Sequence, residues 1–336
     1  NISSNTGNGV FGTTVNGFTI SDSRLVDNTD TDNPNENGIN FDGLIGSGLA
    51  GSNPTRFSDI RVADSHEHNV EIRSSSGTLT ELRVEGSIFS NDGSSTVASN
   101  NFNFLSQGTA SMTLNVQSSE FIGNRGVGAL TASGLFTDGQ ASASLDVTIQ
   151  NSIFEDNNNA VTVSHSGSGA VTFDISNNGT ALRPIVGNLS AVEAAGAGGA
   201  STAINVVMSA TYTGIASGVI DGNTIGNDSI VESGSATGRG IVADMDGSGT
   251  LRAEITNNTI RQTDFNGIRS WTQDTNGGEL LVKVTDNTFR NITSLGIYIR
   301  SRDGLSNTAC AVVSGNAADA TVTSDHVRVR QDTGAV

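Results

Sequence analysis

Lysine, proline, cysteine and aromatic residues are all scarce in this chain of 336 residues. A single cysteine, Cys310, excludes an internal disulfide framework. No apolar run approaches the roughly 20 residues that a membrane-spanning helix needs, so we expect no membrane insertion. No segment carries apolar residues at helical spacing over a useful length. With 41 glycines and only 3 prolines, the turns are made by Gly, Asn, Asp and Ser. These absences predict an all-β chain.

Positive charge is also scarce. Arg and Lys together number 17, Lys283 being the one lysine, against 34 acidic residues, which gives a formal net charge of −17. Such a surface disfavours nucleic acid and anionic membranes as partners, because it cannot neutralise phosphates. A chain rich in Asn, Ser, Thr and Gly with one cysteine is typical of exported bacterial proteins, so we expect an extracellular or cell-surface location. The chain begins in the middle of its sequence pattern, and we therefore expect it to be part of a larger chain or assembly.

One short pattern recurs along the whole chain. In residues 284–289, VTDNTF, a Val or Ile stands three places before a Ser or Asn, and an apolar residue follows two places later. We name the recurring Ser or Asn the ladder position. Its members by sequence alone are Ser23, Ser58, Ser87, Ser119, Ser152, Asn178, Asn223, Asn258, Asn287 and Asn316. Only the second repeat lacks the Val or Ile, having Thr55 in its place.

A period near 30 residues built from short strands predicts a solenoid. Each repeat shows an alternating strand, a tight polar turn, re-entry into the core, a second Gly-Ile strand and a loop rich in Gly and Ser. Stacked coils about 4.8 Å apart would bury the inward residues, so about ten coils would form a rod of roughly 45–50 Å. We predict one domain over residues 1–336, irregular near 181–215.

The phrases NNTIRQTDFNGI (257–268) and DNTFRNITSLGIYI (286–299) resemble the coil of right-handed parallel β-helix proteins of the pectate-lyase-like superfold. The chain is most similar to the bacterial surface and extracellular members. The resemblance implies the fold and the stacking of ladder amides between coils. It does not fix a function, because the superfold includes polysaccharide lyases, hydrolases, phage tailspikes and surface proteins.

The parts of a polysaccharide-cleaving site are incomplete. Polygalacturonase-like enzymes combine Asn-Thr-Asp, an Asp pair, His-Gly and Arg-x-Lys on one face. Asn28-Thr29-Asp30 matches the first part, and nothing matches the rest. Acids are dispersed, without the clusters that calcium-dependent lyase chemistry requires. We therefore assign no catalytic residue and no cofactor-binding residue.

Two kinds of metal site are suggested by the residue types. His66 and His68 would face the same side of a strand and could hold a transition metal, although a solvated turn explains them better. Asp244 and Asp246, in the DMDGSG loop, have the oxygen-rich character of a Ca²⁺ site. The acidic loop 27–33 has a similar character. Calcium at Asp244 and Asp246 is the metal site that we predict.

Three functions follow from these patterns. The leading one is a non-catalytic extracellular structural or adhesive module, such as a stalk, fibre or surface-layer component, that stacks end to end or on flanking coils. The alternative is a carbohydrate-active β-helix enzyme, a lyase, hydrolase or tailspike-like depolymerase. A carbohydrate-binding module is the third, although Trp271 would be a small platform for a polysaccharide. Three convergent acids beside an aromatic ring would distinguish the enzyme.

Overall fold

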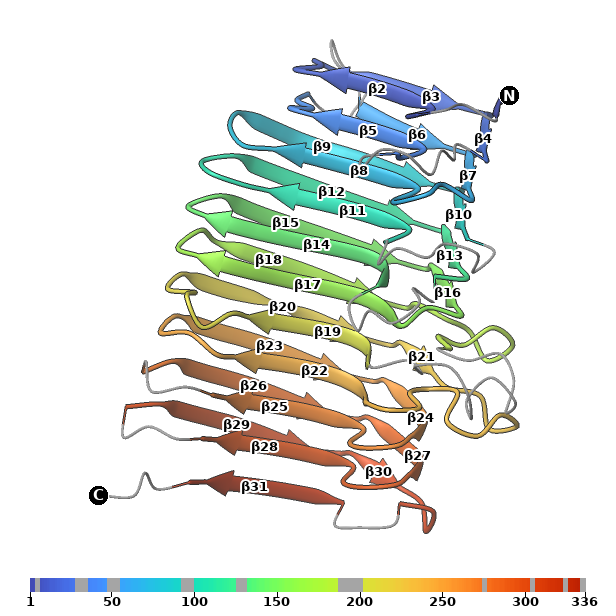
Figure 1. The fold of residues 1–336 in the computed structure, drawn as a ribbon. Helices are drawn as coiled ribbons and strands as arrows, with labels where there is room; N and C mark the ends of the chain where they lie inside the picture. The colour runs from blue at the N-terminus through green and yellow to red at the C-terminus, as the bar shows by residue number, and fades with distance from the viewer. Residues whose placement is uncertain are drawn as a thin grey trace.

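A computed structural model describes residues 1–3, 7–27, 36–46, 55–91, 100–124, 132–186, 202–273, 277–302, 306–322 and 326–332. Within these ranges every regular element is a β-strand, and all paired strands run parallel. Successive strands of one sheet come from successive turns of the chain, so the chain winds from one end of an elongated stack to the other (Figure 1). The chain is a parallel β-helix, as its repeat predicts. None of the described residues form a helix of the length and hydropathy that a membrane span requires.

The longest sheet has 11 strands and forms one side of the solenoid. Its strands are β2 (Val10–Thr13), β5 (Ile39–Asp42), β8 (Val70–Ser74), β11 (Phe102–Ser106), β14 (Ser133–Ala141), β17 (Asn159–Gly167), β19 (Thr202–Met208), β22 (Arg239–Met245), β25 (Ile268–Thr272), β28 (Ile297–Ser301) and β31 (Val327–Gln331). At about 4.8 Å per strand, the stack spans about 48 Å.

The second side is a sheet of 10 strands. Its strands are β3 (Phe18–Ser21), β6 (Thr55–Ser58), β9 (Thr78–Glu85), β12 (Ser111–Gln117), β15 (Ser144–Gln150), β18 (Val171–Ser176), β20 (Ile215–Asp221), β23 (Thr250–Thr256), β26 (Glu279–Thr285) and β29 (Thr308–Ser314).

The third side is built from short strands in two sheets. The first comprises β1 (Ile2–Ser3), β4 (Arg24–Val26), β7 (Arg61–Ala63), β10 (Ile88–Ser90), β13 (Glu120–Ile122) and β16 (Ile153–Glu155). The second comprises β21 (Thr224–Ile225), β24 (Thr259–Thr263), β27 (Thr288–Ile292) and β30 (Ala317–Ala318). Isolated bridges at Ile185 and Val186 connect the two sheets between β16 and β21.

Alternation in each strand sends one residue into the core and the next outward. In the longest sheet, Gly-Ile strands place Ile241, Ile268 and Ile297 in one inward column, each fully buried. On the third side, Phe89, Phe121 and Phe154 stack with ring centroids 5.1 and 4.9 Å apart. Equivalent residues of successive coils therefore form the continuous core that a single coil could not provide.

The turn before the third side requires a left-handed residue. Positive φ angles occur at Asp22, Asp59, Gly86, Ser118, Asn151, Asn177, Gly222, Asn257, Asp286 and Gly315. Each stands directly before a ladder position, which in the second coil is Ile60, and nearly all are Gly, Asn or Asp, the residues that adopt this conformation at least cost. The polar residue before the ladder thus sets the backbone of the turn.

The asparagine ladder forms as the repeat predicts. Asn223 Nδ2 donates to Asn258 Oδ1 at 2.9 Å, and Asn258 Nδ2 donates to Asn287 Oδ1 at 2.9 Å. Each Nδ2 also donates to a main-chain carbonyl of the preceding coil; that of Asn287 donates to Ile255 at 2.9 Å. All three side chains are buried, so the ladder satisfies polar groups inside the turn.

The early coils use serine for a smaller set of contacts. The main-chain N–H of Ser119 donates to Ser152 Oγ at 3.2 Å, and Ser119 Oγ donates to the Gln117 carbonyl at 3.0 Å. The serine hydroxyl accepts one main-chain N–H from the neighbouring coil and donates one hydrogen bond. The asparagine amide has two N–H donors, so it also bonds to the next side chain and to a carbonyl of the preceding coil. The change from serine to asparagine therefore adds side-chain hydrogen bonds along the second half.

The ladder assignment in the second coil is wrong by two residues. Phe57 pairs with Ile20 and Val84, so it occupies the Val/Ile column, and the ladder position falls on Ile60. The main-chain N–H of Ile60 accordingly donates to Ser87 Oγ at 3.3 Å. Ser58 lies at the end of β6. The missing Val or Ile at Thr55 came from this shift of register.

The stretch 181–215 is only partly irregular. Strand β19 pairs in register with β17 and β22, so it belongs to the regular stack. Arg183 anchors the segment before it by hydrogen bonds to Glu120 and Glu155 on β13 and β16. Residues 187–201 lie outside the described ranges.

Candidate functional site: an arginine–aromatic face

Outward side chains of the last strands of the longest sheet combine arginine with aromatic residues. On β25 and β28 the burial alternates, so that Arg269 and Trp271, then Tyr298 and Arg300, face away from the core. The register places Tyr298 between Arg269 and Arg328, and Arg300 between Trp271 and Arg330. We name this surface the arginine–aromatic face. It consists of Arg269, Trp271, Tyr298, Arg300, Arg328 and Arg330.

The aromatic rings orient the guanidinium groups. Arg269 Cζ lies 4.4 Å from the Trp271 ring centroid, and Arg300 Cζ lies 5.4 Å from it. Tyr298 meets Trp271 edge to face, with centroids 5.3 Å apart. Stacking on an aromatic ring fixes a guanidinium while leaving its N–H groups in the ring plane free to meet an anion. The rings therefore act here as supports for the arginines.

Asp244 supports the face from below. It is fully buried, forms an ion pair with Arg269, and accepts the main-chain N–H of Trp271 at 3.0 Å. Strands β22 and β25 pair at Val242–Arg269 and at Met245–Thr272. Between these two pairs, the Asp244 carboxylate accepts a main-chain N–H of β25. Burial raises the pKa of Asp244 to about 6, against the opposing effect of the Arg269 charge.

Asp332 holds the other end of the face. Its carboxylate receives Arg300 Nε at 2.7 Å and Arg330 Nε at 2.5 Å. Three guanidiniums of the face, those of Arg269, Arg300 and Arg330, are thus held by the two carboxylates Asp244 and Asp332. On a chain of net charge −17, four arginines on three neighbouring strands are a local exception.

Buried N–H groups without a hydrogen-bond partner in the described part of the chain include Arg239 Nε, Arg269 Nε and Trp271 Nε1. Arg239 lies over the Phe265 ring at 5.5 Å. Burial, with the Arg269 charge, lowers the pKa of Arg239 to about 10. Buried arginine and tryptophan N–H donors therefore lie beneath the face.

The predicted calcium site lies beside this face. Calcium at Asp244 would have to compete with the Arg269 guanidinium for the same carboxylate. Within the described ranges no three His, Cys, Asp or Glu side chains converge in a way that could hold a metal ion. Calcium at Asp244 and Asp246 stays a prediction, tested by whether a chelator lowers the melting temperature of the native protein but not that of a double Asn variant.

The other sequence candidates are not brought together. His66 and His68 lie in a turn before β8, not on a strand, and His68 Nδ1 accepts the main-chain N–H of Asn100 at 2.9 Å. Burial lowers the pKa of His68. Asn28-Thr29-Asp30 and most of the acidic loop 27–33 lie outside the described residues, Asp27 excepted.

Sequence reasoning singled out Trp271 but missed the arginines around it. The sequence signal is three tripeptides in which large polar or aromatic residues alternate: Arg-Ser-Trp at 269–271, Tyr-Ile-Arg at 298–300 and Arg-Val-Arg at 328–330. Each puts two large polar or aromatic residues on the outward face of a strand. Only the register between coils shows that the three tripeptides lie side by side.

Comparison with known proteins adds no relative: no family model, no curated protein and no solved structure matches this chain.

Proposed function

We propose that this chain is a non-catalytic, extracellular structural or adhesive β-helix module whose arginine–aromatic face holds a polymer that carries anionic groups. The supporting observation is that face itself: four arginines, two of them placed over the Trp271 ring, in adjacent coils of a strongly acidic chain. Coils about 4.8 Å apart repeat the charges at a fixed spacing, which suits a repeating ligand.

Binding without cleavage agrees with the chemistry of the face. The acids at its border, Asp244 and Asp332, are both engaged by arginine. Asp244, although its pKa is raised, is fully buried and has no surface through which to touch a glycosidic bond. A general acid must reach the atom that it protonates. These features favour the adhesive function over the enzymatic alternative.

The test is binding of polygalacturonate, dextran sulfate, neutral dextran and duplex DNA, measured by calorimetry at low and moderate salt. We expect the two acidic polysaccharides to bind, with affinity that falls as salt rises, and neutral dextran and DNA to bind far more weakly. The double variant Arg328→Gln/Arg330→Gln should weaken binding by at least about tenfold.

A matched control uses Arg24 and Arg61, two exposed arginines that face each other in the register of β4 and β7. The variant Arg24→Gln/Arg61→Gln changes the net charge equally and should leave binding unchanged. Equal losses in both variants would show a diffuse charge effect and overturn the assignment of the face. Release of reducing ends from either polysaccharide would favour the enzymatic alternative.

A further inference from the structure

The outer face of the ten-stranded sheet changes character along the stack. Toward the N-terminus its outward residues are polar and form hydrogen bonds across strands: Asn115 donates to Glu81, Thr172 to Asp146, and Gln150 to Asp174. In β20 to β29 the same columns carry Val219, Leu281, Cys310 and Val312 beside Ser217, Arg252, Glu254 and Lys283. The apolar patch is thus concentrated on β26 and β29, with Val219 on β20. A confined apolar patch on an otherwise polar surface marks a site of interaction.

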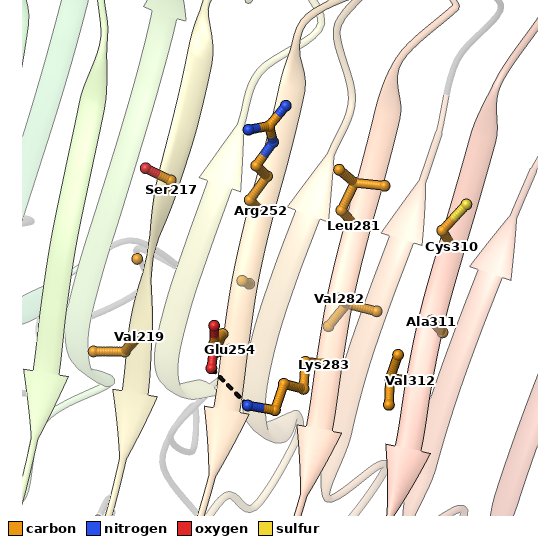
Figure 2. Close-up of a pocket in the computed structure, with 12 residues that line it drawn as sticks. Ser217, Val219, Arg252, Glu254, Leu281, Val282, Lys283, Cys310, Ala311 and Val312 are labelled. Atoms are coloured by element: carbon orange, nitrogen blue, oxygen red, sulfur yellow. Dashed lines mark hydrogen bonds and ion pairs between the residues drawn. The ribbon is translucent and has the colours of Figure 1, made fainter.

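This patch is hollowed into a trough (Figure 2). Its cavity volume is about 500 Å³, within the range of small-molecule sites. One wall is the column Ser217, Arg252, Leu281 and Cys310, and the other is the column Val219, Glu254, Lys283 and Val312. Because each column crosses the strands, the trough runs along the axis of the stack and suits a linear ligand.

The charges on the walls are unequal. Lys283 Nζ donates to Glu254 at 2.9 Å, so these two neutralise one another. Arg252 is exposed and has no ion-pair or hydrogen-bond partner among the described residues. The trough therefore offers one uncompensated cation beside an apolar surface. From β23, which carries Arg252, to β29 the distance is about 10 Å, two strand spacings.

We propose that the trough binds a free medium-chain carboxylate, with its carboxylate on Arg252 and its hydrocarbon chain along Leu281, Cys310 and Val312. Charge complementarity fixes the sign of the head group, and the apolar columns fix the nature of the tail. A bidentate arginine–carboxylate contact adds orientation to the apolar burial. This site lies on a different sheet from the arginine–aromatic face and does not depend on it.

Calorimetry with decanoate, below the concentration at which it forms micelles, tests the proposal. We expect one saturable site. Decanol lacks the charge and should bind at least about tenfold more weakly, and decyltrimethylammonium weaker still. Equal binding of all three, or only non-saturable adsorption, would overturn the proposal.

Variants locate the site. Arg252→Gln should weaken decanoate at least about tenfold and bring it close to decanol, while Leu281→Ser should weaken both. Leu281→Met keeps the volume and should retain binding. Arg61→Gln, at an exposed arginine on the third side, should leave decanoate affinity unchanged. A loss in Arg61→Gln equal to that in Arg252→Gln would contradict the assignment.

Cys310 gives an independent readout, because its thiol is exposed in the wall of the trough. Bound decanoate should slow its reaction with a maleimide, and this protection should disappear in Arg252→Gln. A native chain that is dimeric in solution, and that Leu281→Ser makes monomeric, would show that a second copy covers the trough and would overturn the ligand proposal.

Discussion

The residue before each ladder position determines whether a coil can close. Asn151, with φ of 53°, is exposed, and within the described ranges only its main chain forms a hydrogen bond, donating to the Ser176 carbonyl at 3.2 Å. The left-handed backbone conformation is most unfavourable for a β-branched residue, whereas glycine adopts it without steric cost.

We therefore expect Asn151→Val to destabilise the fold by about 1–2 kcal/mol and Asn151→Gly to change stability little. Urea denaturation of both variants measures the difference. Equal stabilities would mean that the left-handed conformation is not required at this turn.

A buried histidine makes stability depend on pH. His165 is fully buried in β17, its Nε2 lies 2.7 Å from the Ala143 carbonyl, and its ring meets Tyr212 edge to face at 5.1 Å. The close approach needs Gly139, where a Cβ would lie 2.0 Å from His165 Cδ2. Burial lowers the pKa of His165, so the folded state disfavours its protonation.

A depressed folded pKa contributes stability that is complete above the unfolded value of 6.5 and is lost as pH falls below it. We expect the melting temperature to fall between about pH 8 and about pH 5, and His165→Gln to reduce that fall. His68, whose pKa is also lowered, acts in the same sense. Asp244 acts in the opposite sense: because its folded pKa is raised to about 6, its contribution to stability is lost as pH rises from about 4 to about 6. His326→Gln, at an exposed histidine, is the control, and an unchanged pH dependence in His165→Gln would contradict the prediction.

Among the elements, the ladder turn carries side-chain hydrogen bonds that cross from one coil to the next. Asn287 Nδ2 donates to Ile255 and to Asn316 Oδ1, each at 2.9 Å, and its own Oδ1 receives Asn258. Leucine would leave several of these buried groups without partners. We expect Asn287→Leu to cost at least about 1–3 kcal/mol. Thr288→Ala, at the exposed neighbouring residue, should be nearly neutral, and a neutral Asn287→Leu would show that the turn admits water.

The phenylalanine stack is a second feature that joins neighbouring coils, through ring contacts. Phe121 is fully buried between Phe89 and Phe154. Phe121→Ala should cost about 3–5 kcal/mol, because the cavity cannot close between fixed coils. Glu120→Gln should cost only about 0–1 kcal/mol, since its partner Arg183 is 40% exposed. Equal losses of stability in urea would contradict the strand phase.

The elements were predictable from sequence to the extent that they repeat. The ladder asparagines, the inward columns and the parallel coils follow from a pattern that recurs in every turn. The ladder position Ile60 was not predicted, because it is apolar where the other ladder positions are Ser or Asn, and the nearby Ser58 fitted the pattern by chance. The arginine–aromatic face escaped for a different reason: its residues repeat only between β25 and β31, and their proximity depends on register between coils, not on spacing within one.

At the scale of the whole molecule, both terminal coils expose apolar side chains. Val329 is 63% exposed on β31, the edge strand of the longest sheet, and Phe11 is 62% exposed on β2 at the other edge. Edge strands with exposed apolar residues favour pairing with another strand.

We expect the chain to form longer particles as its concentration rises, and Val329→Lys to suppress this growth. Val231→Lys changes an equally exposed valine away from the edges and should not. Light scattering with electron microscopy measures particle length. A native chain that stays monomeric at high concentration would contradict end-to-end association.

The ladder interval has a genetic consequence. Asn258, Asn287 and Asn316 are separated by 29 residues each, and Asn258 and Asn287 each donate through Nδ2 to the next asparagine. An in-frame duplication of one such unit would repeat this ladder hydrogen bond at its junctions. The gene could therefore lengthen or shorten the molecule by whole coils, about 4.8 Å at a time. Because the units between Asn258 and Asn316 contain β25 with β26 and β28 with β29, each added unit would also extend the arginine–aromatic face and the trough by one strand.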